Sequence, residues 1–250
     1  MILLIKKLMK KLIYKPKEEN KYSNKNYIFI DLDTQWVLSS GINLEDFFKY
    51  NNCNIENIIL LDSEVCGNDY NNKHNFHTIK GKTNINTILN PEDICFGNLT
   101  FVDCKYLQNV DGLTLEQIFH ILYFSHCYKK LKYLFENSLN NNYAYYSHDD
   151  GWHTEVYCRN IEDYIILLIN LFYGKLGGQN NEYNRNLIKK LKDIFSKGII
   201  IEFLKDKIML YEIGYYRDVD YVINNYYNIE HNNSYIKHEV TIKNNEMNIS

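Results

Sequence analysis

The pair Asp150-Gly151 lies between two runs of strand-forming residues, 143–148 and 152–159. Asp-Gly is a strong signal for a two-residue turn of type I′, because both turn residues must adopt positive φ angles. Such a turn joins two neighbouring antiparallel strands. The pair therefore predicts a β-hairpin in which residue 149 faces residue 152 and residue 148 faces residue 153.

Two imidazoles meet on this predicted hairpin. His148 and His153 are opposite each other, and Tyr146 and Glu155 share their face. Opposed side chains lie roughly 4.5–5.5 Å apart at Cβ, and two His with a carboxylate suit a transition metal. One alternative is therefore a metal-dependent hydrolase with Zn, Mn or Fe. Its predicted metal ligands are His148, Asp149 and His153, and Glu155 completes its catalytic set.

The same residues are also typical of a structural hairpin tip. In that interpretation the Asp149 carboxylate accepts hydrogen bonds from the turn backbone, and Trp152 covers the edge of the core. In a binding protein without catalysis, Trp152 and Tyr146 are the hairpin side chains that we expect to contact a partner, because aromatic residues are enriched at interfaces.

Four short segments between residues 113 and 152 carry a resemblance to a family. They are Leu113-Thr114-x-Glu116-x-Ile118, Leu122-Tyr123-Phe124-x-His126, Leu134-Phe135-Glu136-x-x-Leu139-Asn140-Asn141 and Tyr146-x-His148-Asp149-Asp150-Gly151-Trp152. The stretch 113–159 resembles a family of uncharacterised proteins from low-G+C bacteria. The resemblance covers about a fifth of the chain. It implies no particular reaction and directs attention to the HDDGW core at 148–152.

Composition narrows the class of protein. The chain has 250 residues, of which 45% are hydrophobic, with 23 Tyr and 12 Phe. This excludes an intrinsically disordered chain and allows a sizeable core. The net charge of −3 argues against electrostatic capture of nucleic acid. The excess of Asn and Lys over Arg is typical of an AT-rich bacterial genome and carries no functional meaning.

The cysteines and the N-terminus bear on localisation. None of the six Cys forms a CxxC pair, so a zinc ribbon is disfavoured and reduced thiols in the cytoplasm are expected. Residues 1–13 place apolar residues and lysines at helical spacing, which predicts a basic amphipathic helix too short to span a bilayer. We expect this helix to pack on the domain, or to dock on a membrane surface or a partner.

The remaining pattern predicts an α+β fold in a single domain, with a mainly antiparallel or mixed sheet and three to four packed helices. Residues 1–26 form the N-terminal helix and linker, 27–242 the domain, and 243–250 a loose tail. Strands are expected at 27–30, 58–62, 76–79, 99–104, 143–148, 152–159, 199–204 and 207–213, and strands are also expected within 219–242. Helices are expected at 44–50, 114–128, 161–173 and 182–196.

Two further patterns need a choice between chemistry and structure. Asp31 and Asp33 follow a strand, as in the Asp pair that haloacid-dehalogenase-like phosphotransferases use, but Thr34-Gln35-Trp36 departs from that pattern. We therefore expect a strand-end cap. The helix that begins after Thr114 has a capping box and an expected buried stripe at 115, 118, 119, 122 and 123. His120 on this helix is expected to be a packed, hydrogen-bonded residue.

These observations favour a non-enzymatic cytoplasmic module that binds a protein partner, as antitoxin or immunity proteins do. The contact surface is expected to be an aromatic-rich sheet face, because the chain is rich in Tyr and mildly acidic. No cofactor is required in this interpretation. The alternatives are the metal-dependent hydrolase of the hairpin and a peripheral membrane protein that docks through residues 1–13.

Overall fold

The computed structural model describes residues 25–40, 42–52, 54–61, 70–71, 76–88, 99–124, 134–148, 153–178, 184–214 and 235–250. Three predictions fall outside these ranges. They concern the amphipathic segment 1–13, the turn residues 149–152, and the part before residue 235 of the region 219–242 in which strands are expected.

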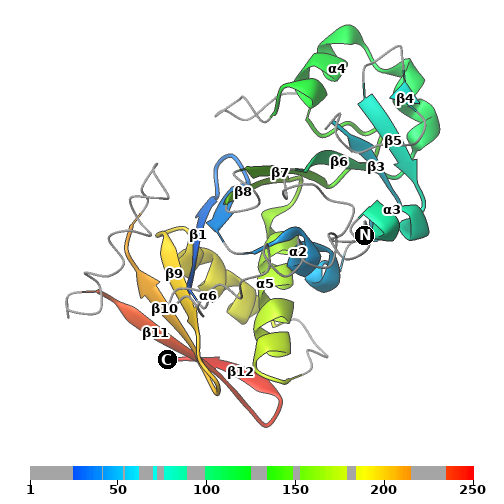
Figure 1. Ribbon diagram of the computed structural model, residues 1–250. Helices are drawn as coiled ribbons and strands as arrows, with labels where there is room; N and C mark the ends of the chain where they lie inside the picture. The colour runs from blue at the N-terminus through cyan, green and yellow to red at the C-terminus, as the bar shows by residue number, and fades with distance from the viewer. Residues whose placement is uncertain are drawn as a thin grey trace, which may run out of the picture.

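The described strands form one antiparallel sheet, which dominates the fold (Figure 1). Its twelve strands run in the order β12-β11-β10-β9-β1-β2-β8-β7-β6-β3-β5-β4. Their bounds are β1 Lys25–Asp31, β2 Trp36–Ser40, β3 Asn57–Leu60, β4 Tyr70–Asn71, β5 Phe76–Lys80, β6 Thr100–Cys104, β7 Tyr143–His148, β8 His153–Cys158, β9 Ile199–Phe203, β10 Ile208–Glu212, β11 Lys237–Lys243 and β12 Glu246–Ile249. The predicted α+β class with an antiparallel sheet is confirmed.

The described residues contain more helices than the three to four that we predicted. They are α2 Leu44–Tyr50, α3 Lys82–Ile88, the 3-10 helix η1 Leu107–Gly112, α4 Leu115–Leu122, α5 Ile161–Lys175 and α6 Arg185–Phe195. The prediction missed α3 because, after Lys82, its sequence consists of Thr, Asn and Ile, which have lower helix propensity. No helix in the described ranges is both long enough and apolar enough to cross a membrane.

The largest core lies on the face of the sheet that carries Ile28, Val37 and Phe101, which we call the α5 face. Helix α5 lies against α2, α6 and β8 on this face. Phe47 of α2 joins an aromatic cluster there, with its ring centroid 5.1 Å from that of Tyr145 and 5.4 Å from that of Tyr143. These contacts make the α5 face the main hydrophobic interior.

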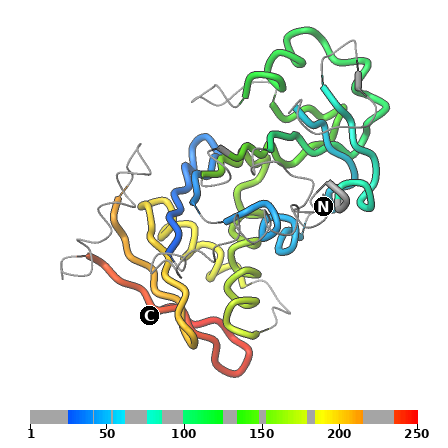
Figure 2. The backbone as a smooth tube through the Cα atoms, in the orientation of Figure 1, coloured from blue at the N-terminus to red at the C-terminus, as the bar shows by residue number. Residues whose placement is uncertain are grey.

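A second core lies on the opposite face, which carries Val102, Ala144 and Tyr157 and which we call the α4 face. Ile118 and Ile121 of α4 pack against it. Figures 1 and 2 show α4 at one end of the molecule, with β11 and β12 at the other. The two cores therefore use different faces of the same sheet.

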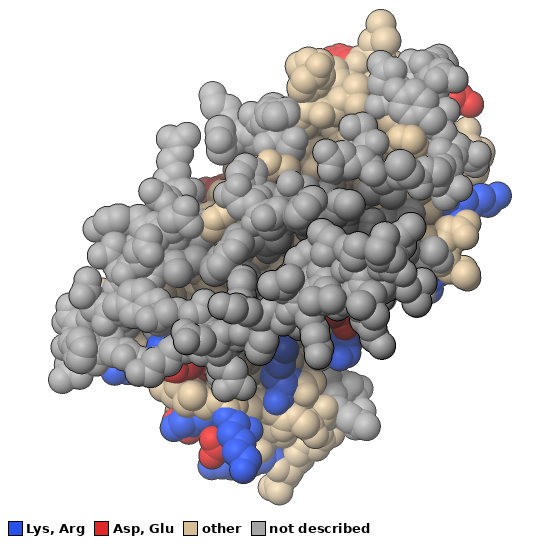
Figure 3. Space-filling model, in the orientation of Figure 1, with Lys and Arg blue, Asp and Glu red and all other residues tan. Residues whose placement is uncertain are grey.

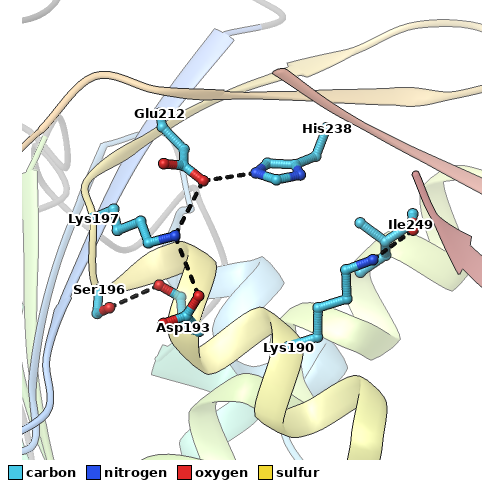
Figure 4. A network of polar contacts seen from close by, with 7 residues as sticks. All are labelled: Lys190, Asp193, Ser196, Lys197, Glu212, His238 and Ile249. Atoms are coloured by element: carbon cyan, nitrogen blue, oxygen red, sulfur yellow. Dashed lines mark hydrogen bonds and ion pairs between the residues drawn. The ribbon is translucent and has the colours of Figure 1, made fainter. Parts of the chain in front are cut away.

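The expected loose tail is wrong, because Glu246–Ile249 forms β12 beside β11. Met247 and Ile249 pack against the main core, and this burial holds the strand in place. The outward edge of β12 also has side-chain partners. The Met247 amide donates to the Tyr173 hydroxyl at 3.1 Å, and Lys190 Nζ donates to the Ile249 carbonyl at 2.6 Å (Figure 4).

Candidate functional site

The predicted hairpin is formed by β7 and β8. His148 pairs with His153, and Tyr146 pairs with Glu155, in the register that the Asp-Gly turn predicts. Tyr157 continues the same row into the core of the α4 face. The structure therefore confirms that these four positions share one face of the sheet. Asp149 and Trp152, in the turn itself, lie outside the described residues.

Glu155 of the predicted catalytic set already has a polar contact. Trp36 on β2 donates its indole N–H to Glu155 Oε2 at 3.1 Å. The Trp36 ring also lies 6.4 Å from the Phe29 ring and 6.5 Å from the Tyr157 ring, which places it in an aromatic row. Sequence reasoning missed Trp36, because only the sheet order brings β2 beside β8.

The metal prediction depends on side chains that are only partly described. Among the side chains that the structure does describe, no three or more His, Cys, Asp or Glu come together as a metal site. The side chains of His148 and Asp149 lie outside that set, whereas His153 is described and half-buried. The ligand set of His148, Asp149 and His153 therefore stays a prediction.

Asp103 on β6 is a buried carboxylate that sequence reasoning did not single out. Its Oδ1 accepts from the Asn142 amide at 2.7 Å and from the Tyr143 amide at 2.5 Å. Burial raises the pKa of Asp103 to about 7, while the two amides and nearby Arg159 oppose that shift. The carboxyl group thus anchors the start of β7 and is engaged in structure.

The loop 134–142 is held by Asn141 and Arg159. Asn141 Nδ2 donates to the Leu134 carbonyl at 2.7 Å, and its Oδ1 accepts from the Glu136 amide at 2.8 Å. Arg159 Nε donates to the Asn141 carbonyl at 2.7 Å. Asn141 and Thr114 belong to two of the four segments that carry the family resemblance. Both have structural roles, Asn141 in this loop and Thr114 in the capping box of α4.

A second polar cluster joins β10, β11 and α6 (Figure 4). His238 Nε2 lies 2.7 Å from Glu212 Oε1, and Lys197 Nζ lies 3.4 Å from the same oxygen. Lys197 also pairs with Asp193 Oδ2 at 3.2 Å. The cluster ties the end of α6 to the ends of two strands. Because its contacts connect the end of α6 to β10 and β11, we interpret it as structural.

Asp31 is a strand-end cap, as expected. Its Oδ1 accepts from the Asp33 amide at 2.9 Å and from the Thr34 amide at 3.2 Å. Gln35, at the end of this turn, has a φ of 54°. The carboxylate thus stabilises the turn between β1 and β2, which supports a structural role over phosphotransfer chemistry.

The sheet tyrosines are mostly interior. Tyr27, Tyr143, Tyr145 and Tyr157 are buried, whereas Tyr146 and Tyr211 are half-buried. The four buried tyrosines therefore belong to the core and offer little surface to a partner.

Helix α4 presents an apolar stripe to solvent. Leu115, Phe119 and Tyr123 are 86%, 55% and 48% exposed, respectively. They are spaced four residues apart, so they share one side of the helix, and the rings of Phe119 and Tyr123 lie 4.8 Å apart. We define these three residues as the α4 stripe.

The predicted buried stripe of this helix was therefore wrong in three of its positions. Ile118 and Ile121 point to the sheet, and Leu115, Phe119 and Tyr123 point away. The helix was also predicted to continue to residue 128, but α4 ends at Leu122. Residues 125–133 lie outside the described ranges. Apolar residues occupy both sides of α4, so the pattern alone did not select the side that packs.

Comparison with protein-family models, curated proteins and solved structures finds no match to this chain. The resemblance of residues 113–159 to a bacterial family therefore stays a prediction. Function has to be inferred from the two features described above, the polar row of the hairpin and the α4 stripe.

Proposed function

We propose that the protein is a non-enzymatic module that binds a protein partner, in the manner of an antitoxin or immunity protein, and that α4 is its contact helix. The observation that carries this proposal is the α4 stripe of Leu115, Phe119 and Tyr123, which is exposed on a helix whose other side is already packed. The proposed contact surface is therefore helix α4, and not the aromatic-rich sheet face that was expected from the sequence.

The energetics of exposed apolar surface support this assignment. A surface helix normally turns polar residues to solvent and apolar residues to the core. Each Å² of apolar surface removed from water contributes about 25 cal/mol, so covering a Leu and two aromatic rings is favourable. Contiguous exposed apolar patches mark interaction sites in soluble proteins. Anchors at i, i+4 and i+8 are the pattern by which a helix lies in a hydrophobic groove.

The test is affinity capture with matched variants. Phe119→Ala removes the central ring of the α4 stripe, and Leu32→Ala removes an exposed apolar side chain in the turn after β1. We expect the wild-type and Leu32→Ala proteins to retain a common partner, identified by mass spectrometry, and Phe119→Ala to lose it at least about tenfold. Identical recovery with all three proteins would refute the proposal.

The metal-dependent hydrolase remains a second candidate, supported by the pairing of His148 with His153 beside Glu155. Two imidazoles on one face are a common start for a transition-metal site. Elemental analysis of the purified protein, before and after incubation with Zn²⁺ or Mn²⁺, tests this candidate, and His153→Ala is the control variant. Metal below about 0.1 equivalent in both samples would remove this candidate, since a functional site of this kind binds one ion.

A further inference from the structure

We draw no further inference here: the strongest candidate, the lysine-rich surface patch on α6 at the end of the molecule where most of the visible Lys and Arg side chains lie (Figure 3), carries nothing, because two of its lysines already contact Glu162 and the Ile249 carbonyl and nothing in the structure shows what covers the rest of the patch.

Discussion

Helices α5 and α4 are both apolar on more than one side, yet they have different fates. Most of α5 is enclosed between the sheet, α2 and α6, and it buries Ile161, Tyr164, Ile165, Leu167, Leu168, Ile169, Leu171, Phe172 and Tyr173. Helix α4 buries Ile118 and Ile121 and exposes Leu115, Phe119 and Tyr123. The difference shows that a helix with apolar residues on several sides is fully buried only where other elements pack against each of those sides. Helix α5 is packed on most sides, whereas the outer side of α4 is partly exposed to solvent.

The largest expected effect is the loss of stability when Phe172 of α5 is truncated, which is later compared with the truncation of Phe119 of α4. Phe172 of α5 is fully buried, with its ring 6.2 Å from that of Phe195 and 6.3 Å from that of Phe203. Phe172→Ala should lower the free energy of unfolding by about 3–5 kcal/mol, because it leaves a cavity. Urea denaturation measures the change. A loss below about 1 kcal/mol would mean that α5 is not the centre of the core.

The second effect concerns Asp103, the buried carboxylate on β6. Because the pKa of Asp103 is raised to about 7, the folded protein holds this proton more tightly than the unfolded chain. The contribution is full below the unfolded pKa near 4 and is lost as pH rises through 7, by about 2–3 kcal/mol between pH 5 and pH 8.

Asp103→Asn is the matched variant for this pH dependence. Its amide oxygen can still accept from the Asn142 and Tyr143 amides, but the side chain cannot ionise. Unfolding free energies at pH 5 and pH 8 should therefore differ less in the variant than in the wild-type protein. Equal pH dependence in the two proteins would show that Asp103 does not titrate as stated.

A smaller effect is expected at the start of α4. The Thr114 hydroxyl accepts from the Gln117 amide at 3.2 Å, and Gln117 Oε1 accepts from the Thr114 amide at 2.7 Å. Thr114→Ala should cost about 1 kcal/mol in unfolding free energy, and Thr114→Ser should retain most of it. If the Ser and Ala variants melt alike, the capping box does not stabilise this helix.

The smallest effect on stability is expected at Phe119. Because its ring is 55% exposed, Phe119→Ala should change the unfolding free energy by less than about 0.5 kcal/mol. The same substitution is expected to abolish partner binding. A loss of stability near that of Phe172→Ala would mean that the ring is packed inside the protein, and the contrast between the two helices would disappear.

Local signals predicted the elements whose ends are marked by specific side chains. Asp150-Gly151 predicted the register of β7 and β8, Asn160 caps α5, and Gly198, with a φ of 68°, follows α6 as expected. In each case one or two residues force a backbone geometry, so the sequence alone suffices.

Other elements depend on contacts that no local pattern contains. β2 was missed because it follows a turn in which Gln35, and not a glycine, adopts the left-handed conformation. β12 was taken for a tail because its stability comes from packing of Met247 and Ile249 on a distant core. The same holds for the candidate site. The row of side chains on the hairpin could be predicted from residue spacing, whereas the α4 stripe could be identified only once the position of the sheet was known.

The side-chain contacts along β12 have a consequence for self-association. An exposed terminal strand is normally a template on which another chain can add a strand, and so a risk for fibre formation. Here Tyr173 and Lys190 occupy an amide and a carbonyl that an added strand would need. A strand that adds to this edge of the sheet would first have to break both contacts, so they oppose templated growth there.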